Sequence, residues 1–198
     1  GMNVCAGSSA GCRAGCLRYS GQNITDPAHL ARVNRTLFLG RNRAGFLARL
    51  TNELIRFQRD AGRAGLTPCF RPNALSDLPW LGQHFARVFP GLQVYDYTKI
   101  PRPWEREMDN YNLTFSRSEH NEDQCIECLT RGLNVAVVFN GELPARWEIG
   151  GETYAVLKGD ENDLRFLDAR PQIVGLKLKG SREARRAAIE SGFAVKGE

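Results

Sequence analysis

Three cysteines lie within the first 16 residues of the chain, at Cys5, Cys12 and Cys16. The residues between them are mostly Gly, Ala and Ser, which bury little apolar surface but let a backbone wrap closely around a ligand. Thiolates are good ligands for soft and borderline metals. The pattern therefore predicts a loop whose three cysteines hold an iron–sulfur cluster or a zinc ion.

The other three cysteines favour a packing role. Cys125 and Cys128 are three residues apart in a predicted helix, so both face one side of it, and free Cys behaves as a small buried apolar residue. The alternative is that one of them supplies a fourth metal ligand. Cys69 falls within a predicted strand and is expected in the core. Because no secretory signal is evident, we expect a cytoplasmic protein that uses cysteines for metal rather than for disulfides.

The positive charge is concentrated in the first third of the chain. Residues 1–66 contain ten Arg, no Lys and three carboxylates, a balance of +7, so the remainder carries −2 of the net +5. This favours a polyanionic partner such as DNA, RNA or a nucleotide, or another anionic substrate. Arg13 and Arg18, beside the cysteines, are predicted to bind it and to face the same cleft as the catalytic side chains. The alternative is a solvated helix face.

Hydrophobic periodicity divides the chain into three segments of one predicted domain. Residues 1–24 form the cysteine loop, 25–66 a helical segment and 67–198 an α/β core. The helical segment is expected to contain helices at 27–38 and 43–63. In the core, short strands alternate with helices. The strands are predicted at 67–71, 92–97, 112–116, 135–139, 154–158 and 173–177, and the helices at 79–88, 104–109, 123–131 and 182–191.

Strand–helix alternation is typical of parallel pairing. With about six strands, the chain is short for a closed eight-stranded barrel, so we predict an α/β fold with a partial (β/α) barrel or an open, mainly parallel sheet. No run of 18 apolar residues suggests a membrane-spanning helix.

Polar side chains follow nearly every predicted strand. In parallel sheets the carboxyl ends of the strands meet at one edge, where active sites lie. For single residues a structural role is an alternative: Asp77 could cap the next helix, Asp96 and Lys99 could form a surface pair, and the segment 160–163 could be a polar turn. The predicted catalytic set is Asp77, Asp96, Lys99, His120, Asp160 and Lys177, and the predicted substrate-binding set, besides the two arginines above, is Arg71, Asn73, Ser116 and Asn140.

The cysteine loop is similar to that of radical-SAM-like phage proteins, which share the Cys-x6-Cys spacing with Ser and Gly before the second cysteine. In those proteins the third cysteine follows after two residues, whereas three separate Cys12 from Cys16 here. The rest of the chain resembles an uncharacterised family of conserved phage gene products. The stretches that carry this resemblance are 5–16, 71–80, 95–99, 113–119, 134–139, 159–168 and 175–180.

The leading hypothesis is thus a phage-type metalloenzyme with an iron–sulfur cluster. The resemblance implies radical-SAM-like chemistry with S-adenosylmethionine as a cofactor, on a nucleotide, nucleic acid or other anionic substrate. Two alternatives stay open. One is a zinc-stabilised enzyme that modifies nucleic acid by base exchange or hydrolysis. The other is a non-catalytic module that binds nucleic acid or a host protein. No membrane partner is expected.

Overall fold

Eight strands form one mainly parallel sheet in this computed structural model, which describes residues 3–198. Its order is β1-β2-β3-β4-β7-β6-β5, and only the β5–β6 hairpin is antiparallel. The sheet is open, so the prediction of an α/β fold with a mainly parallel, unclosed sheet is confirmed. The strands are β1 (Cys69–Phe70), β2 (Gln93–Thr98), β3 (Tyr111–Ser116), β4 (Val135–Asn140), β5 (Arg146–Ile149), β6 (Glu152–Lys158), β7 (Ile173–Lys177) and β8 (Ala194–Lys196).

The sheet divides along one side of β4. Strand β3 pairs with the start of β4, at Val135 and Ala136. Strand β8 pairs with its end, from Val138 to Asn140. Strand β3 therefore contacts β4 only through its last residues, Phe115 and Ser116, so its amino half has no β4 partner. Beyond Ser116, β8 takes the place of β3 beside β4.

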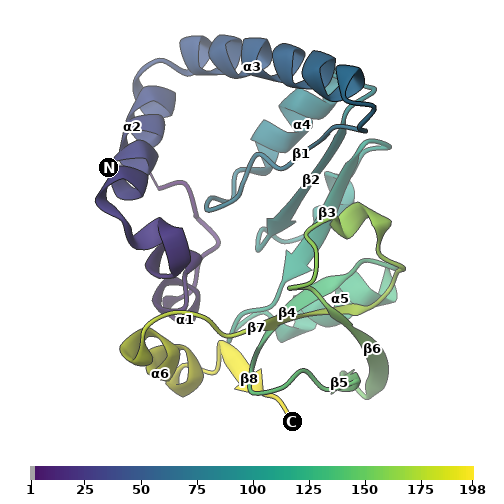
Figure 1. Cartoon of the computed structure of the whole chain (residues 1–198). Coiled ribbons are helices and arrows are strands. Elements are labelled where there is room, and N and C mark those ends of the chain that lie inside the picture. The colour runs from purple at the N-terminus through teal and green to yellow at the C-terminus, as the bar shows by residue number, and fades with distance from the viewer. Residues whose placement is uncertain (1–2) are drawn as a thin grey trace.

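The helices cover the sheet unequally. Helices α4 (Pro79–Val88) and α5 (Glu122–Thr130) pack on one face, whereas α1 (Ala10–Ala14) lies against α6 (Arg182–Glu190). Helices α2 (Asp26–Arg41) and α3 (Arg43–Arg63) form an arch that runs from the α1 side of the molecule to α4 (Figure 1). Asn42 separates them: its side chain accepts a hydrogen bond from Gly45 N (2.8 Å) and caps α3. Short 3₁₀ turns occur at 17–19, 21–24, 103–105 and 165–167.

Alternation along β4 separates the two faces of the sheet. Val135, Val137 and Phe139 are buried in the main core with Cys125 and Cys128 of α5. Ala136 and Val138 point to the opposite face, where both line a cavity and Val138 also packs against the cluster of Ala188 and Phe193. A second core lies beneath α4, where Leu54 of α3 is buried against Leu81 and Phe85 together with Phe46 and Leu50. The arch is therefore attached to the α/β core through α3.

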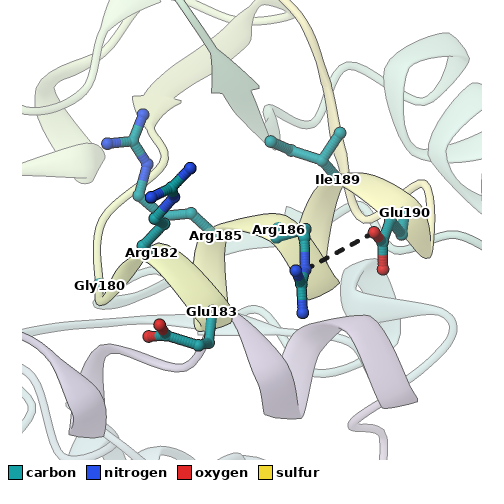
Figure 2. A pocket seen from close by; sticks show the side chains of 7 residues that line it. All are labelled: Gly180, Arg182, Glu183, Arg185, Arg186, Ile189 and Glu190. Carbon is teal, nitrogen blue, oxygen red and sulfur yellow. Dashed lines mark ion pairs between the residues drawn. The ribbon is translucent and has the colours of Figure 1, made fainter.

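Helix α6 presents a row of charged side chains to solvent. Arg182 and Arg185 extend to the same side of the helix, and Arg186 pairs with Glu190 at 3.7 Å (Figure 2). These side chains line a surface hollow of about 730 Å³. Neither a cysteine nor a strand belongs to its lining, so this hollow is separate from the carboxyl edge.

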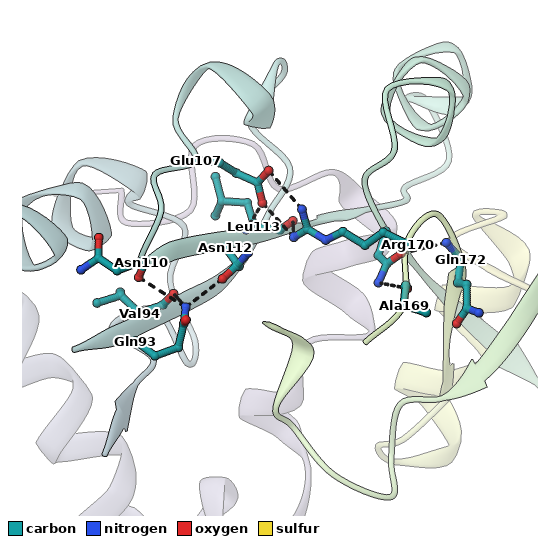
Figure 3. Close-up of polar contacts among 10 residues, drawn as sticks. Gln93, Val94, Glu107, Asn110, Asn112, Leu113, Ala169, Arg170 and Gln172 are labelled. Carbon is teal, nitrogen blue, oxygen red and sulfur yellow. Dashed lines mark hydrogen bonds and ion pairs between the residues drawn. The ribbon is translucent and has the colours of Figure 1, made fainter. Parts of the chain in front are cut away.

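The gap between the amino ends of β3 and β4 is closed by side chains. Leu113 lies too early in β3 to pair with β4, so its backbone groups need other partners. Glu107 accepts the Leu113 N–H (2.9 Å), and Arg170 donates both to Glu107 (2.8 Å) and to the Leu113 carbonyl (3.3 Å). Figure 3 shows the ion pair of Glu107 and Arg170 beside Leu113. Asn134 accepts from Gln172 N (2.8 Å) and donates to the Ala169 carbonyl (3.1 Å), so it binds the chain on both sides of Arg170.

The elements predicted from periodicity are largely confirmed. The helices at 43–63 and 79–88 and the strand at 173–177 have the predicted bounds. Three elements were missed: α1, β5 and β8. The predicted helix at 104–109 is instead a 3₁₀ turn over Pro103–Glu105, because the chain turns back within a few residues through an antiparallel bridge between Met108 and Tyr111 to begin β3.

Candidate functional site

A cavity of about 510 Å³ lies at the carboxyl edge of the parallel strands, on the face of the sheet that α4 and α5 leave open. Its floor includes Ala136, Val138 and Tyr97. Its rim is made by the segments that follow β1, β2, β3 and β7, and the cysteine loop lies across it. Of the predicted site residues, it gathers Cys5, Cys12, Cys16, Arg71, Asn73, Asp77, Lys99, Ser116, Asp160 and Lys177.

Several hydrogen bonds attach the cysteine loop to this edge. Asp77 N donates to the Val4 carbonyl (2.7 Å), and the Cys5 thiol lies 3.6 Å from the Leu75 carbonyl oxygen. On the other side of the cavity, Glu119 accepts from Ser9 Oγ (2.6 Å) and from Gly11 N (2.8 Å). Burial alone would raise the pKa of Glu119, but these hydrogen bonds lower it below its ordinary value. Glu119 is thus an ionised carboxylate that binds the start of α1.

Small residues let the cysteine loop lie close to the segments that flank β2 and β8. A Cβ on Gly11 would lie 2.3 Å from Ser191 Oγ and 2.5 Å from Phe193 Cβ, and one on Gly7 would lie 3.1 Å from Lys99 Cβ. The glycines are therefore required by contact with the sheet. This contact is the structural reason for the composition of the loop.

All six cysteines are free thiols, and those of the loop share one environment. Burial raises the pKa of the Cys5 thiol; negative charge on Asp77, Cys16 and Cys12 raises it further, while Lys99 lowers it. The three thiols therefore lie near enough to feel one another's charge. As they stand, no three Cys, His, Asp or Glu side chains among residues 3–198 are close enough together to hold a single metal ion.

Asp77 and Lys99 meet at the end of β2. The Asp77 carboxylate accepts from Thr98 Oγ1 (2.8 Å) and from Lys99 N (2.7 Å), so it fixes the loop after β1 to β2 instead of capping α4. Burial raises the pKa of Asp77, and these hydrogen bonds only partly oppose that. The Lys99 ammonium lies 5.6 Å from the centre of the Phe193 ring, and it forms no ion pair within the described residues.

The remaining charged groups of the cavity are mostly paired. Arg71 binds Asp163 (2.6 Å) and lies over the Tyr97 ring, 4.6 Å from its centre. Asp160 accepts from Lys177 N (2.8 Å) and pairs with Lys179 (2.6 Å). The Lys177 ammonium pairs with Glu142 (2.7 Å). Lys99 is therefore the cation most available to a ligand.

A family model for Gene product 88 matches residues 1–197. The chain belongs to this family of phage gene products. Searches of curated proteins and of solved structures give no match. In the described part of this family member, residues 3–198, no helix is long and apolar enough to cross a membrane.

Two predicted site residues are structural. Asp96 is buried beneath the cavity, where it accepts from Asn73 N (2.8 Å), Asn73 Nδ2 (2.9 Å) and Tyr111 OH (3.1 Å). It is not paired with Lys99, as the surface-pair alternative required. Asn73 lines the cavity, but its side chain is engaged with Asp96, Ser76 and the backbone of Leu78. Together they hold the loop after β1 in shape.

Four other predicted residues lie outside the cavity. His120 is exposed on the turn after β3, because the chain turns away there to begin α5. Asn140 is paired with β8, which covers the end of β4. Arg13 folds back to the Ser8 carbonyl (2.7 Å), and Arg18 lies over the Tyr19 ring on the outer side of the loop. The prediction that both arginines face this cavity is therefore wrong.

Some residues that line the cavity or hold the cysteine loop were not predicted. Arg117 and Lys179 line the cavity, and each follows a predicted strand, so the strand-end argument could have found them. Glu119 could not have been found, since only the fold brings it to Ser9 and Gly11.

Cys125 and Cys128 are fully buried, and burial raises the pKa of each thiol to about 12, which confirms their packing role.

Proposed function

We propose that this protein is a phage metalloenzyme that holds an iron–sulfur cluster through Cys5, Cys12 and Cys16 and acts on an anionic substrate. One observation carries the proposal. The three thiols of a loop with little core of its own line the same cavity as the polar side chains that follow the parallel strands.

The donor set favours a cluster over a structural zinc ion. A structural zinc ion is closed by four convergent ligands, about 2.0–2.3 Å from the metal. The loop offers three thiols that line one cavity but do not lie at single-ion spacing, and Cys125 and Cys128 are buried in the core. A cluster spreads its cysteine ligands over several irons, and three thiolates would leave one iron open to a cofactor such as S-adenosylmethionine. When bound, such a group would supply one-electron chemistry.

The protein's own side chains would bind and orient the substrate. Lys99 presents a free ammonium group beside Cys5, where it can attract the negative charge of a ligand. Arg117 donates to the carbonyls of Gly192 and Phe193 (2.9 and 3.2 Å), so its charge is held at the cavity wall. Asp77, whose pKa burial raises, holds a proton more readily than an exposed carboxylate does, so it is suited to proton transfer.

Metal analysis of anaerobically purified protein tests the proposal. We expect iron and acid-labile sulfide, with a brown colour and absorbance near about 400 nm. Ser substitution of Cys5, Cys12 or Cys16 should abolish that absorbance. Cys69→Ser is the matched control, since Cys69 is also a half-buried thiol but lies in β1 outside the cavity. A colourless protein with stoichiometric zinc would support the zinc alternative, and a metal-free protein would exclude both.

A further inference from the structure

A second, larger cavity lies beneath α2. It has a volume of about 1020 Å³ and runs between α2 and the segment that follows β1. We call it the α2 groove and define it by Ile24, Val33, Leu37, Leu75 and Leu78. Its volume reaches the upper limit of small-molecule pockets, about 300–1,000 Å³, so it has room for a segment of a polymer.

The apolar side of α2 is not covered by the rest of the chain. Leu39 is the one buried residue of this 16-residue helix, while Leu30, Val33 and Leu37 are 59, 39 and 43% exposed. These three residues are spaced at i, i+3 and i+7, so they lie on one side of the helix. Figure 1 shows α2 standing away from the sheet. Most helical stability comes from packing an apolar face, so this face is suited to a partner.

Arginines accompany the apolar residues. Arg18, Arg32 and Arg35 line the groove, and none of them forms an ion pair within residues 3–198. Arg32 donates to the Asn23 carbonyl (2.9 Å), which holds its guanidinium in place. Asp26 is the one carboxylate among the described residues that line the groove. The groove therefore combines an apolar surface with uncompensated positive charge.

We propose that the α2 groove binds an acidic, leucine-rich polypeptide segment. An amphipathic peptide would place apolar side chains against Val33 and Leu37, and carboxylates against Arg32 and Arg35. Single-stranded nucleic acid fits less well, because its bases stack on exposed aromatic rings. The larger aromatic rings of the groove are Tyr19, whose ring Arg18 already covers, and Phe46, which packs on the core. The exposed imidazole of His29 is the one other aromatic side chain among the described lining residues.

The two cavities lie side by side and share part of their walls. Cys16, Ala74, Leu75 and Ser76 line both, so a chain bound in the α2 groove can continue past Cys16 to the cysteine cavity. This extension rests on the proposed function, and it identifies the anionic substrate as an acidic polypeptide whose reacting residue enters the cysteine cavity.

Fluorescence anisotropy tests the proposal with a labelled peptide of repeated Glu-Leu-Ala-Leu-Glu units. The matched probes are the same peptide with Lys in place of Glu, and a thymidine oligonucleotide of similar length. We expect the acidic peptide alone to bind, with an affinity that falls as salt is added. Arg32→Glu with Arg35→Glu should weaken binding about tenfold or more. Val33→Asp with Leu37→Asp should weaken it without unfolding the protein, because both positions are exposed.

The control is Arg56→Glu with Arg63→Glu, which makes the same charge change on an exposed side of α3 outside the groove. Equal weakening by the control would overturn the proposal, as would no peptide binding at low salt or arginine-dependent binding of the oligonucleotide in its place. Iron content, measured on the same samples, separates the two proposals. Normal iron without peptide binding would overturn the groove alone, whereas peptide binding without iron would overturn the cluster alone.

Discussion

The two edges of the sheet carry similar polar side chains and use them differently. At the amino edge, Glu107, Arg170 and Asn134 bind one another or the backbone groups that the divergent strands leave unpaired. At the carboxyl edge, Lys99 and the thiols of the cysteine loop face a cavity instead. Side chains thus close the gap beside the amino half of β3, whereas the carboxyl edge of the sheet keeps a cavity. Polar residues at a strand end indicate a site only where the fold leaves them without partners.

Gly82→Ala should have the largest effect on stability, because it changes the contact between α4 and β3 in the core. A Cβ at Gly82 would lie 2.3 Å from Tyr111 Cζ and 2.4 Å from its hydroxyl oxygen, and Tyr111 is fully buried. We expect the free energy of unfolding to fall by about 3 kcal/mol or more, as for severe overpacking. Urea denaturation measures this loss. A loss below about 1 kcal/mol would show that α4 can shift away from β3.

Arg170→Met should have the next largest effect. It leaves Glu107, which is largely buried, without its ion-pair partner and the Leu113 carbonyl without a donor. We expect a loss of about 1–3 kcal/mol in unfolding free energy, with the occupancy of the proposed metal site unchanged in the folded protein. The double variant with Glu107→Gln should lose less unfolding free energy than the two single variants lose in sum. Additive losses would mean that the two side chains act independently.

The sequence predicted correctly those elements whose signal lies within the element itself. The helix over 43–63 and the strand over 173–177 were predicted correctly, since their apolar periodicity is strong within a few turns or residues. Strand β8 has three residues and pairs with β4 just beyond the point where β3 ends, an arrangement that no local pattern encodes. Helix α1 lies in a small-residue loop and depends on Glu119, more than 100 residues away.

The same distinction applies to the site. The argument that strand ends converge placed Asp77, Lys99 and Lys177 at one cavity with the cysteines. It could not show that Asp96 would be turned into the core by the alternation of β2, or that Asn140 would be covered by β8. Residue type and strand position predict which groups reach the edge. The packing of later segments decides which of them stay available.

The pH dependence of stability tests whether Asp96 has a structural role in the buried core. Burial raises its pKa from 3.8 to about 7, against the hydrogen bonds from Asn73 and Tyr111. The folded state therefore binds a proton that the unfolded state releases, so this group's contribution to stability is complete below about pH 4 and is lost as the pH rises to about 7. The slope is at most about 1.4 kcal/mol per pH unit.

Urea denaturation at several pH values should show this slope in the wild type and a flatter curve for Asp96→Asn. Asp109→Asn is the control, since Asp109 is exposed. If the wild type and Asp96→Asn keep the same slope, Asp96 does not titrate in this range.

Gly11→Ala should have the smallest effect on stability and the clearest effect on the cysteine loop. Its Cβ would meet Ser191, Phe193 and Glu119 and would push α1 away from the carboxyl edge. Because the loop contributes little to the two main cores, we expect the unfolding free energy to change by less than about 1 kcal/mol. The thiols should nevertheless become more exposed, so Cys5, Cys12 and Cys16 should react faster with a thiol reagent in the metal-free protein. Gly62→Ala is the control, since a Cβ there meets nothing within 4 Å, and it should leave the reaction rate unchanged. A loss of stability as large as that of Gly82→Ala would contradict the comparison, because the loop would then be part of the cooperative core rather than an attachment that exposes its thiols to a ligand.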